Sequence, residues 1–192
     1  MNKTITCFIP YGSENQINKT IRHLQECPTV DRIFLLPTSP VPNLSLPDKC
    51  YILPSSAPES VERYKQVALY ANTPFTLICT QVQDLEFGYM ALERMCDYLS
   101  APQCSMVYAD HYKTIKGERI PHPVIDYQLG SVRDDFDFGS LLMFRTDYLK
   151  RAINEIEAEK EYQHSALYAL RLALSIYGEL THIREFLYTE TE

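Results

Sequence analysis

SMVYADH (residues 105–111) and RDDFDFGSLLMFR (residues 133–145) are the two stretches that decide the fold. The first is a short apolar run that stops at an acid, and the second is an acidic segment that leads into an apolar run. Both patterns predict buried strands with polar residues at one end. In an open α/β sheet, ligands bind in the crevice beyond the carboxyl ends of the strands. Acids gathered there predict a site for a metal, a sugar hydroxyl or the counter-ion of a phosphate ester.

Outward from these stretches, predicted strands alternate with predicted helices. Short apolar runs predict strands over residues 4–9, 32–36, 50–53, 75–79 and 181–188, the last as an edge strand. Helical spacing of apolar residues predicts helices that follow Ser13 and Ser60 and cover residues 87–99, 148–156 and 163–177. A polar loop is expected through residues 116–117. The alternation predicts an α/β fold, a three-layer sandwich whose mostly parallel central sheet has helices on both faces.

Composition limits the classes of function that remain. The chain has 192 residues, of which 45% are hydrophobic, which suits one domain with a substantial core. Its net charge of -7 argues against a nucleic-acid partner, which would need a basic stripe. No apolar run approaches the roughly 18 residues of a membrane span, and the amino terminus has no signal-peptide pattern. We therefore expect a cytoplasmic protein without a transmembrane segment, whose six cysteines are free thiols.

Several stretches together resemble the family-2 glycosyltransferases. They are residues 4–10, 32–36, 72–78, 89–95, 107–110, 138–145 and 183–188. The resemblance implies a single GT-A-like domain over residues 1–192, in which a nucleotide-sugar donor lies across the carboxyl ends of the first strands. It also implies that the hydroxyl of a glycan or lipid-linked acceptor attacks the anomeric carbon with inversion. Family members often continue further, so the chain is either the N-terminal part of a longer protein or a minimal member.

The nucleotide pocket is expected directly after the first strand. Pro10, Tyr11, Gly12 and Ser13 stand where the family contacts the nucleotide base, and they open a helix. A helix N-terminus favours a nearby anion. The alternative is an ordinary strand-to-helix turn, in which Gly12 supplies a positive φ and Ser13 caps the helix. The residues alone leave both interpretations open.

The expected metal site departs from the family pattern. Family members usually carry Asp-x-Asp after the strand that matches residues 75–79, whereas this chain has TQVQD at residues 80–84. Amides leave the charge of a divalent ion uncompensated. Gln81 and Gln83 could instead bond to sugar or ribose hydroxyls, beside Asp84, and Arg133 could neutralise the diphosphate.

Asp110 and His111 are the candidate replacement ligands for the manganese or magnesium ion that the resemblance implies. They end a strand that neighbours the expected donor site, and they combine a carboxylate with an imidazole. The alternative is that Asp110 caps a turn and that His111 is a solvated loop residue.

The catalytic base is expected in the acidic segment. Family members carry a Glu-Asp pair near the start of the helix that matches residues 163–177, and this chain has no carboxylate there. Asp134, Asp135 and Asp137 are the candidate catalytic carboxylates, because a cluster near a crevice can raise one pKa or recruit a cation. The phenylalanines between these acids suggest a walled pocket. The alternative is a solvated acidic loop.

These observations favour a glycosyltransferase that uses a nucleotide-sugar. The resemblance further implies cell-surface polysaccharide synthesis, with peripheral association at the inner membrane face. The alternative is a non-catalytic binding module that keeps the fold and has lost the metal site. A nucleotidyltransferase would need a glycine-rich, basic loop after the first strand, and the residues that follow Ile9 do not provide one.

Overall fold

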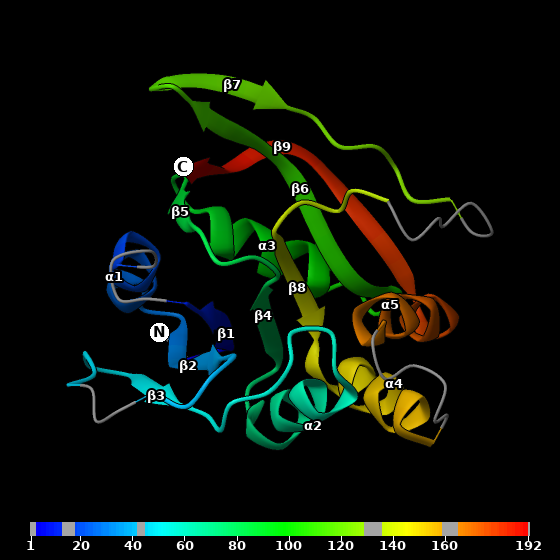
Figure 1. Cartoon of the computed structure of the whole chain (residues 1–192). Helices are drawn as coiled ribbons and strands as arrows, with labels where there is room; N and C mark the ends of the chain where they lie inside the picture. Colours follow the sequence, from blue (N-terminus) through cyan, green and yellow to red (C-terminus); the bar gives the residue numbers. More distant parts are fainter. Residues whose placement is uncertain (1–2, 13–17, 42–44, 129–135, 159–164, 192) are drawn as a thin grey trace.

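The computed structural model describes residues 3–12, 18–41, 45–128, 136–158 and 165–191. Within these residues nine strands form one sheet, in the order β3-β2-β1-β4-β8-β6-β9-β5, with β7 paired to β6 (Figure 1). The strands are β1 (Ile5–Tyr11), β2 (Val30–Pro37), β3 (Cys50–Ile52), β4 (Phe75–Cys79), β5 (Asp84–Phe87), β6 (Cys104–Ile115), β7 (Glu118–His122), β8 (Leu141–Arg145) and β9 (Glu179–Thr191). The helices are α1 (Asn18–Glu26), α2 (Val61–Tyr70), α3 (Ala91–Leu99), α4 (Thr146–Ala158) and α5 (Ala166–Tyr177).

The first four strands of this order, from β3 to β4, are parallel, and the interior of this part is buried. Strand β1 runs parallel to both β2 and β4, and all seven of its residues are buried. Such continuous apolar strands are typical of a parallel sheet that is covered on both faces. Two separate cores confirm this arrangement. One packs under α1 and α3, and the other packs under α2, α4 and α5.

Strand β8 lies antiparallel between β4 and β6, which run parallel to each other. The start of β8 therefore meets the end of β4 and lies beside the middle of β6, towards the top of Figure 1. The backbone N–H of Thr80, just after β4, donates to the carbonyl oxygen of Ser140, just before β8, at 2.9 Å. We call this side, with the ends of β1, β2 and β4 and the middle of β6, the carboxyl edge.

The structure confirms the predicted α/β sandwich and corrects four elements. The predicted helix over residues 87–99 begins at Ala91, because β5 precedes it and pairs with β9. The polar stretch around residues 116–117 is a tight hairpin turn that leads into β7. The final strand is not an edge strand, since β9 lies between β6 and β5. The strand predicted at residues 105–111 continues to Ile115, because pairing with β7 and β9 extends it.

Two smaller expectations concern helix ends and membranes. Ser60 caps α2 as predicted, and its hydroxyl accepts the backbone N–H of Arg63 at 3.3 Å. The predicted cap at Ser13 lies outside the described residues. In the described part of the chain, no helix is long and apolar enough to cross a membrane.

Candidate functional site at the carboxyl edge

The turn after β1 lies at the carboxyl edge, as the sequence predicts. Pro10 and Tyr11 are the last residues of β1 and are buried, and Gly12 follows as an exposed bend. Tyr11 is paired with Pro37 at the end of β2. Ser13 lies outside the described residues. The predicted nucleotide pocket thus begins where two parallel strands end side by side.

A buried arginine holds the end of β2 in place. The Arg63 guanidinium donates to the carbonyl oxygens of Leu36, Pro37 and Ser56, at 3.4, 3.3 and 2.6 Å. Burial lowers the pKa of Arg63. Because three backbone carbonyls bind this cation, it braces the loop after β2.

The segment after β4 carries the two predicted glutamines. Gln81 is exposed and Gln83 is half-buried. The buried amide nitrogen of Gln83 has no hydrogen-bond partner among the described residues. Asp84 starts β5, and its carboxylate accepts the backbone N–H of Lys19 in α1 at 3.2 Å. Asp84 is therefore bound to the first turn of a helix, and the glutamines remain as the polar groups of this segment.

The structure separates Asp110 from His111. Asp110 Oδ1 accepts the backbone N–H of Val124 at 2.8 Å and lies 2.9 Å from His182 Nε2. His182 Nδ1 lies 2.7 Å from Asp126, and the Arg184 guanidinium also donates to Asp126. We call Asp110, His182, Asp126 and Arg184 the Asp110 network. Its two carboxylates each lie within hydrogen-bond distance of one ring nitrogen of His182.

His111 belongs to a second group of residues. Its ring is buried, lies parallel to the Tyr188 ring at a centroid distance of 4.9 Å, and approaches the His122 ring at 4.6 Å. Nε2 lies 3.2 Å from a Glu190 oxygen, but neither ring nitrogen has a partner with hydrogen-bond geometry in the described residues. Burial lowers the pKa of His111, although Glu190 opposes this.

The segment before β8 closes the second group. The Tyr188 hydroxyl accepts the backbone N–H of Ser140 at 3.0 Å, and burial raises the Tyr188 pKa. The Ser140 hydroxyl is buried and has no hydrogen-bond partner within the described ranges. Gly139 has φ +74°, and a Cβ there would lie 2.3 Å from the Tyr188 hydroxyl. Only glycine fits between these side chains.

Asp137 joins the second group through two hydrogen bonds. Oδ1 accepts the backbone N–H of Gly139 at 2.8 Å, and Oδ2 lies 2.7 Å from His122 Nε2. Burial alone would raise the Asp137 pKa, but the bonds from His122 and Gly139 outweigh it and lower the pKa. We call these residues the His111 cluster. Its members are His111, His122, Asp137, Gly139, Ser140, Tyr188 and Glu190.

The other predicted acids and the basic residue beside them are not placed. Arg133, Asp134 and Asp135 lie outside the described residues. Phe136 and Phe138 do not form a pocket wall beside Asp137. Their rings pack together at 4.4 Å, and Phe138 is buried in the core under α5, where the Arg171 guanidinium lies over its ring at 4.7 Å.

The described side chains do not fit a divalent metal ion. Within the described residues, no group of three or more His, Cys, Asp or Glu side chains is placed to hold one. Asp110 and His111 have separate partners, and Asp137 and Glu190 each face a histidine. Asp110 and His111 are therefore not placed to bind one metal ion together.

Sequence reasoning missed most of the His111 cluster. His122, Tyr188 and Glu190 arrive on β7 and β9, which pair with β6. The available signals were weak. Prolines flank His122 on both sides, and Gly139 follows an acidic segment. Neither feature specifies a partner in the sequence.

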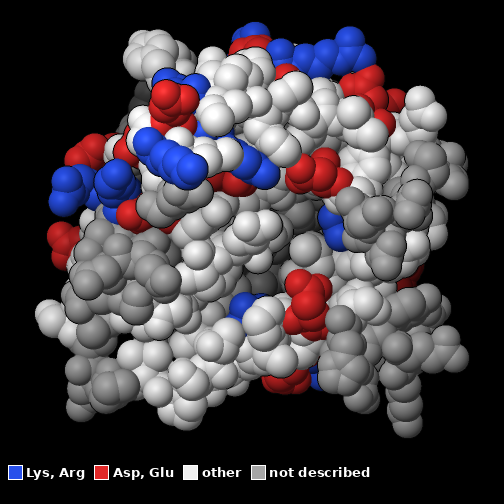
Figure 2. Space-filling view, turned by 45° about the horizontal axis from the view of Figure 1, so that its top comes forward, with Lys and Arg blue, Asp and Glu red and all other residues white. Residues whose placement is uncertain are grey.

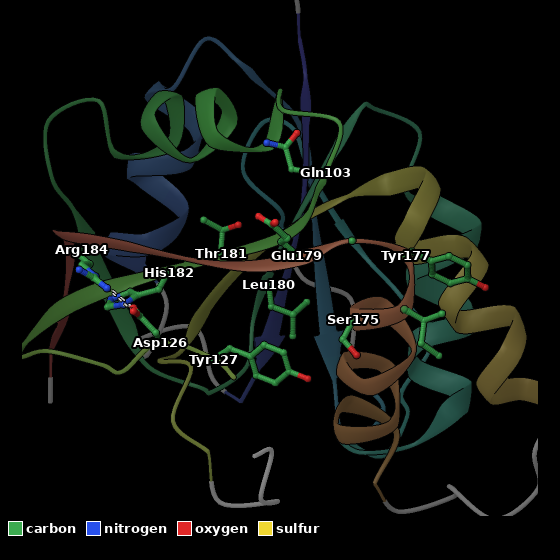
Figure 3. Close-up of a pocket in the computed structure, with 12 residues that line it drawn as sticks. Gln103, Asp126, Tyr127, Ser175, Tyr177, Glu179, Leu180, Thr181, His182 and Arg184 are labelled. Carbon is green, nitrogen blue, oxygen red and sulfur yellow. Dashed lines mark hydrogen bonds and ion pairs between the residues drawn. The ribbon is translucent and has the colours of Figure 1, made fainter. Parts of the chain in front are cut away.

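Figure 2 shows the molecule with the top of Figure 1 tilted forward. The centre of this face is hollowed, and acidic and basic side chains lie intermixed around the hollow. A separate cavity of about 760 Å³ runs along the first half of β9 (Figure 3). Asp126, His182 and Arg184 lie together at one end of it, and Tyr177 lies at the other. None of the residues predicted from the sequence lines this cavity.

No protein-family model and no curated protein matches the sequence. The fold is nevertheless similar to solved structures. S. aureus TarS 1-349 in complex with UDP-GlcNAc superposes with a TM-score of 0.62 at 14% identity. That comparison covers 98% of this chain and 58% of the TarS chain, so this chain spans less than two thirds of TarS 1-349.

Two cytidylyltransferases are also similar. The 4-diphosphocytidyl-2C-methyl-D-erythritol synthase of Anaerococcus prevotii has a TM-score of 0.58 at 8% identity, over 94% of this chain and 87% of its own. The 2-C-methyl-D-erythritol 4-phosphate cytidylyltransferase of Francisella tularensis has a TM-score of 0.57 at 10% identity, over 98% of this chain and 91% of its own. At these identities the comparisons show the fold alone. It is a GT-A-like fold.

Proposed function

We propose that this chain is a glycosyltransferase domain of the family-2 type. It binds a nucleotide-sugar at the carboxyl edge and transfers the sugar, with inversion, to a hydroxyl of a glycan or lipid-linked acceptor. The observation that carries this proposal is the His111 cluster, where the buried ring nitrogens of His111 have no partner with hydrogen-bond geometry among the described residues, although Nε2 lies 3.2 Å from a Glu190 oxygen. Buried polar groups are costly unless they are hydrogen-bonded. These atoms are buried, so a polar ligand would supply the missing partners by displacing the side chains that cover them.

The predicted nucleotide-binding and catalytic residues each have a part in this proposal. Pro10, Tyr11, Gly12 and Ser13 border the nucleotide, and Gln81 and Gln83 bond to ribose or sugar hydroxyls, next to Asp84. Arg133 faces the diphosphate. Asp134, Asp135 and Asp137 are the candidate catalytic carboxylates on the side where the acceptor binds. Manganese and magnesium stay proposed cofactors, and we derive no step through them because the described side chains do not fit an ion.

A sugar transfer is favoured over a nucleotidyl transfer by the turn after β1. Nucleotidyltransferases of this fold are expected to hold a triphosphate with a glycine-rich, basic loop at this place. Residues 10–18 contain one glycine and neither lysine nor arginine. The similarity to the two cytidylyltransferases therefore supports the shared fold, and the loop chemistry supports a sugar donor.

A second candidate is a binding module without catalysis. It is favoured by residues 80–83, where two glutamines stand in place of the carboxylates expected from the family pattern. Such a module would bind a nucleotide-sugar and leave it intact. For either function we propose a cytoplasmic location with peripheral attachment to the inner membrane face, and a role in cell-surface polysaccharide synthesis.

A thermal-shift panel tests the proposed function. UDP-GlcNAc, the matching GDP-, CMP- and dTDP-sugars, and CTP are each added with and without manganese. A ligand at 100 times its Kd stabilises the native state by about 2.7 kcal/mol, which is readily detected. We expect one nucleotide-sugar to stabilise the protein more than CTP does. Stabilisation by CTP alone would favour the nucleotidyltransferase class, and no stabilisation by any nucleotide-sugar would contradict the donor site.

A further inference from the structure

His122 and Asp137 form a hydrogen-bonded pair at the carboxyl edge. Asp137 Oδ2 lies 2.7 Å from His122 Nε2, and Asp137 is itself fixed by the Gly139 backbone N–H at 2.8 Å. An ionised carboxylate only accepts hydrogen bonds. His122 Nε2 therefore carries the hydrogen, and Nδ1 is the nitrogen that remains to accept a proton.

The surroundings hold the His122 ring in a fixed orientation. His122 is paired across the strands with His111, and the two ring centroids lie 4.6 Å apart. Pro121 and Pro123 flank it, and each fixes its own backbone φ. The His122 side chain is 35% exposed, so it is held by neighbours and still reaches solvent. A pre-oriented and accessible imidazole is suited to proton transfer.

The pair also lies where an acceptor would meet a donor. Asp137 and Gly139 directly precede β8, and Ser140 O accepts the Thr80 N–H just after β4. The predicted sugar-binding segment at residues 80–83 therefore starts beside the segment that holds Asp137. The geometry brings a histidine–carboxylate pair to the edge at which the fold binds its ligands.

We propose that His122 is the general base of sugar transfer and that Asp137 is its positioning residue. This inference rests on the proposed function. His122 Nδ1 takes the proton from the attacking hydroxyl of the acceptor, or from water. The oxygen bonds to the anomeric carbon as the bond from that carbon to the diphosphate oxygen breaks. The nucleoside diphosphate leaves with the electron pair, and the proton passes from His122 to solvent.

This assignment replaces a carboxylate base with an imidazole. Asp137 lowers the energy of the imidazolium and fixes its tautomer, as the acid does in a serine-hydrolase triad. Histidine changes its charge between about pH 5 and 8, so it can act as a base near neutrality. The charged and titratable groups around it are Asp137 before β8, His111 and Lys113 on β6, and Glu190 on β9.

The test separates donor binding from turnover. His122→Gln, Asp137→Asn and Asp126→Asn are compared with the natural protein. Asp126→Asn is the matched control, because Asp126 also lies 2.7 Å from a histidine but belongs to the Asp110 network. Thermal shift gives the Kd of the nucleotide-sugar, and release of nucleoside diphosphate gives the turnover, with water as acceptor where no sugar acceptor is known.

We expect His122→Gln to lower turnover by about 10² to 10⁴-fold and to change the Kd little. It should also change the dependence of turnover on pH. Asp137→Asn should lower turnover less, and Asp126→Asn should not change it. Natural turnover in His122→Gln would overturn the proposal, as would donor binding without any turnover in the natural protein. Failure of every nucleotide-sugar to bind would instead overturn the proposed function.

If His122→Gln does not fold, Asp137→Asn carries the test. Its isosteric side chain keeps the hydrogen bond from Gly139, so donor binding should persist. A drop in turnover with an altered pH profile supports the proposal, and natural turnover contradicts it.

Discussion

The two groups of polar residues around Asp110 and His111 in β6 differ in how well their hydrogen bonds are satisfied. In the Asp110 network, each ring nitrogen of His182 lies within 2.9 Å of a carboxylate oxygen. In the His111 cluster, the buried ring of His111 finds no hydrogen-bond partner among the described residues. Nearly all buried polar groups in native proteins are hydrogen-bonded, so a buried polar group without a hydrogen bond needs an explanation. We infer that the first group holds the fold together and that the second is kept for a ligand.

The largest expected effect comes from breaking the Asp110 network. Asp110→Ala leaves His182, whose side chain is 6% exposed, without its buried partner, and leaves the Val124 N–H without an acceptor. Asp110 accepts two buried hydrogen bonds, and each buried donor left without an acceptor costs about 1 to 3 kcal/mol. Urea unfolding measures the loss of stability.

Arg184→Ala is the control for this prediction. The Arg184 side chain is 74% exposed, and exposed ion pairs contribute little to stability. If Asp110→Ala were no more destabilising than Arg184→Ala, the Asp110 network would not contribute to the stability of the fold.

Next in size is the effect of filling the space at Gly139. Gly139→Ala places a methyl group 2.3 Å from the Tyr188 hydroxyl, at φ +74°. Strain at positive φ and overpacking together should cost about 2 to 4 kcal/mol. The change should also weaken binding of the nucleotide-sugar, because it displaces Tyr188 and the His111 ring. Thermal melts with and without the donor measure both effects.

Gly117→Ala is the matched control. Gly117 has φ +81°, but a Cβ there meets nothing within 4 Å. Gly117→Ala should lose about 1 kcal/mol of stability, from the strain of a positive φ alone. It should bind the donor as the natural protein does. Equal losses of stability in both variants would show that the His111 cluster is not tightly packed.

The substitution His111→Phe is expected to increase the stability of the protein by a smaller amount. Phe at this position keeps a ring against Tyr188 and removes two buried nitrogens that lack partners. Replacing an unsatisfied buried group by an apolar one can stabilise, here by about 1 kcal/mol. His111→Phe should therefore unfold at higher urea and bind the nucleotide-sugar more weakly. A variant that is less stable but binds normally would contradict the account of this cluster.

The smallest effect is a dependence of stability on pH. Burial lowers the His111 pKa from 6.5, so the unfolded chain takes up this proton at a higher pH than the folded protein. The contribution of His111 is fully present above pH 6.5 and falls as the pH drops through 6.5 towards the lowered value. Unfolding free energies between pH 5 and 8 measure the slope. His111→Phe should flatten it, and an unchanged slope would assign it to other groups.

The sequence predicted the strands that lie in the core. β4 and β8 are continuous apolar runs that end at polar residues, and the structure has them where their composition placed them. The missed strands, β5 and β7, are short and partly exposed. These segments form strands because β5 pairs with β9 and β7 pairs with β6. Such long-range pairing cannot be predicted from the local amino-acid composition.

The candidate site follows the same rule. Asp137 was predicted because acids gather in one segment of the chain. His122 and Tyr188 were missed because they meet that segment only after folding, and Ser140 and Tyr188 are 48 residues apart in the chain. Asp110 and His111 were predicted together because they are adjacent in sequence. They have different partners in the structure, because neighbouring side chains in a strand point to opposite faces.

The most direct test of the comparison is a histidine side-chain NMR titration. The chain has five histidines, which single substitutions can assign. The protein is titrated with the nucleotide-sugar that gives the largest thermal shift. We predict that the ring signals of His111 and His122 move as the donor binds and that the His182 signal stays in place. Donor binding that moves the His182 signal and leaves His111 and His122 unchanged would contradict the assignment of the His111 cluster to the ligand.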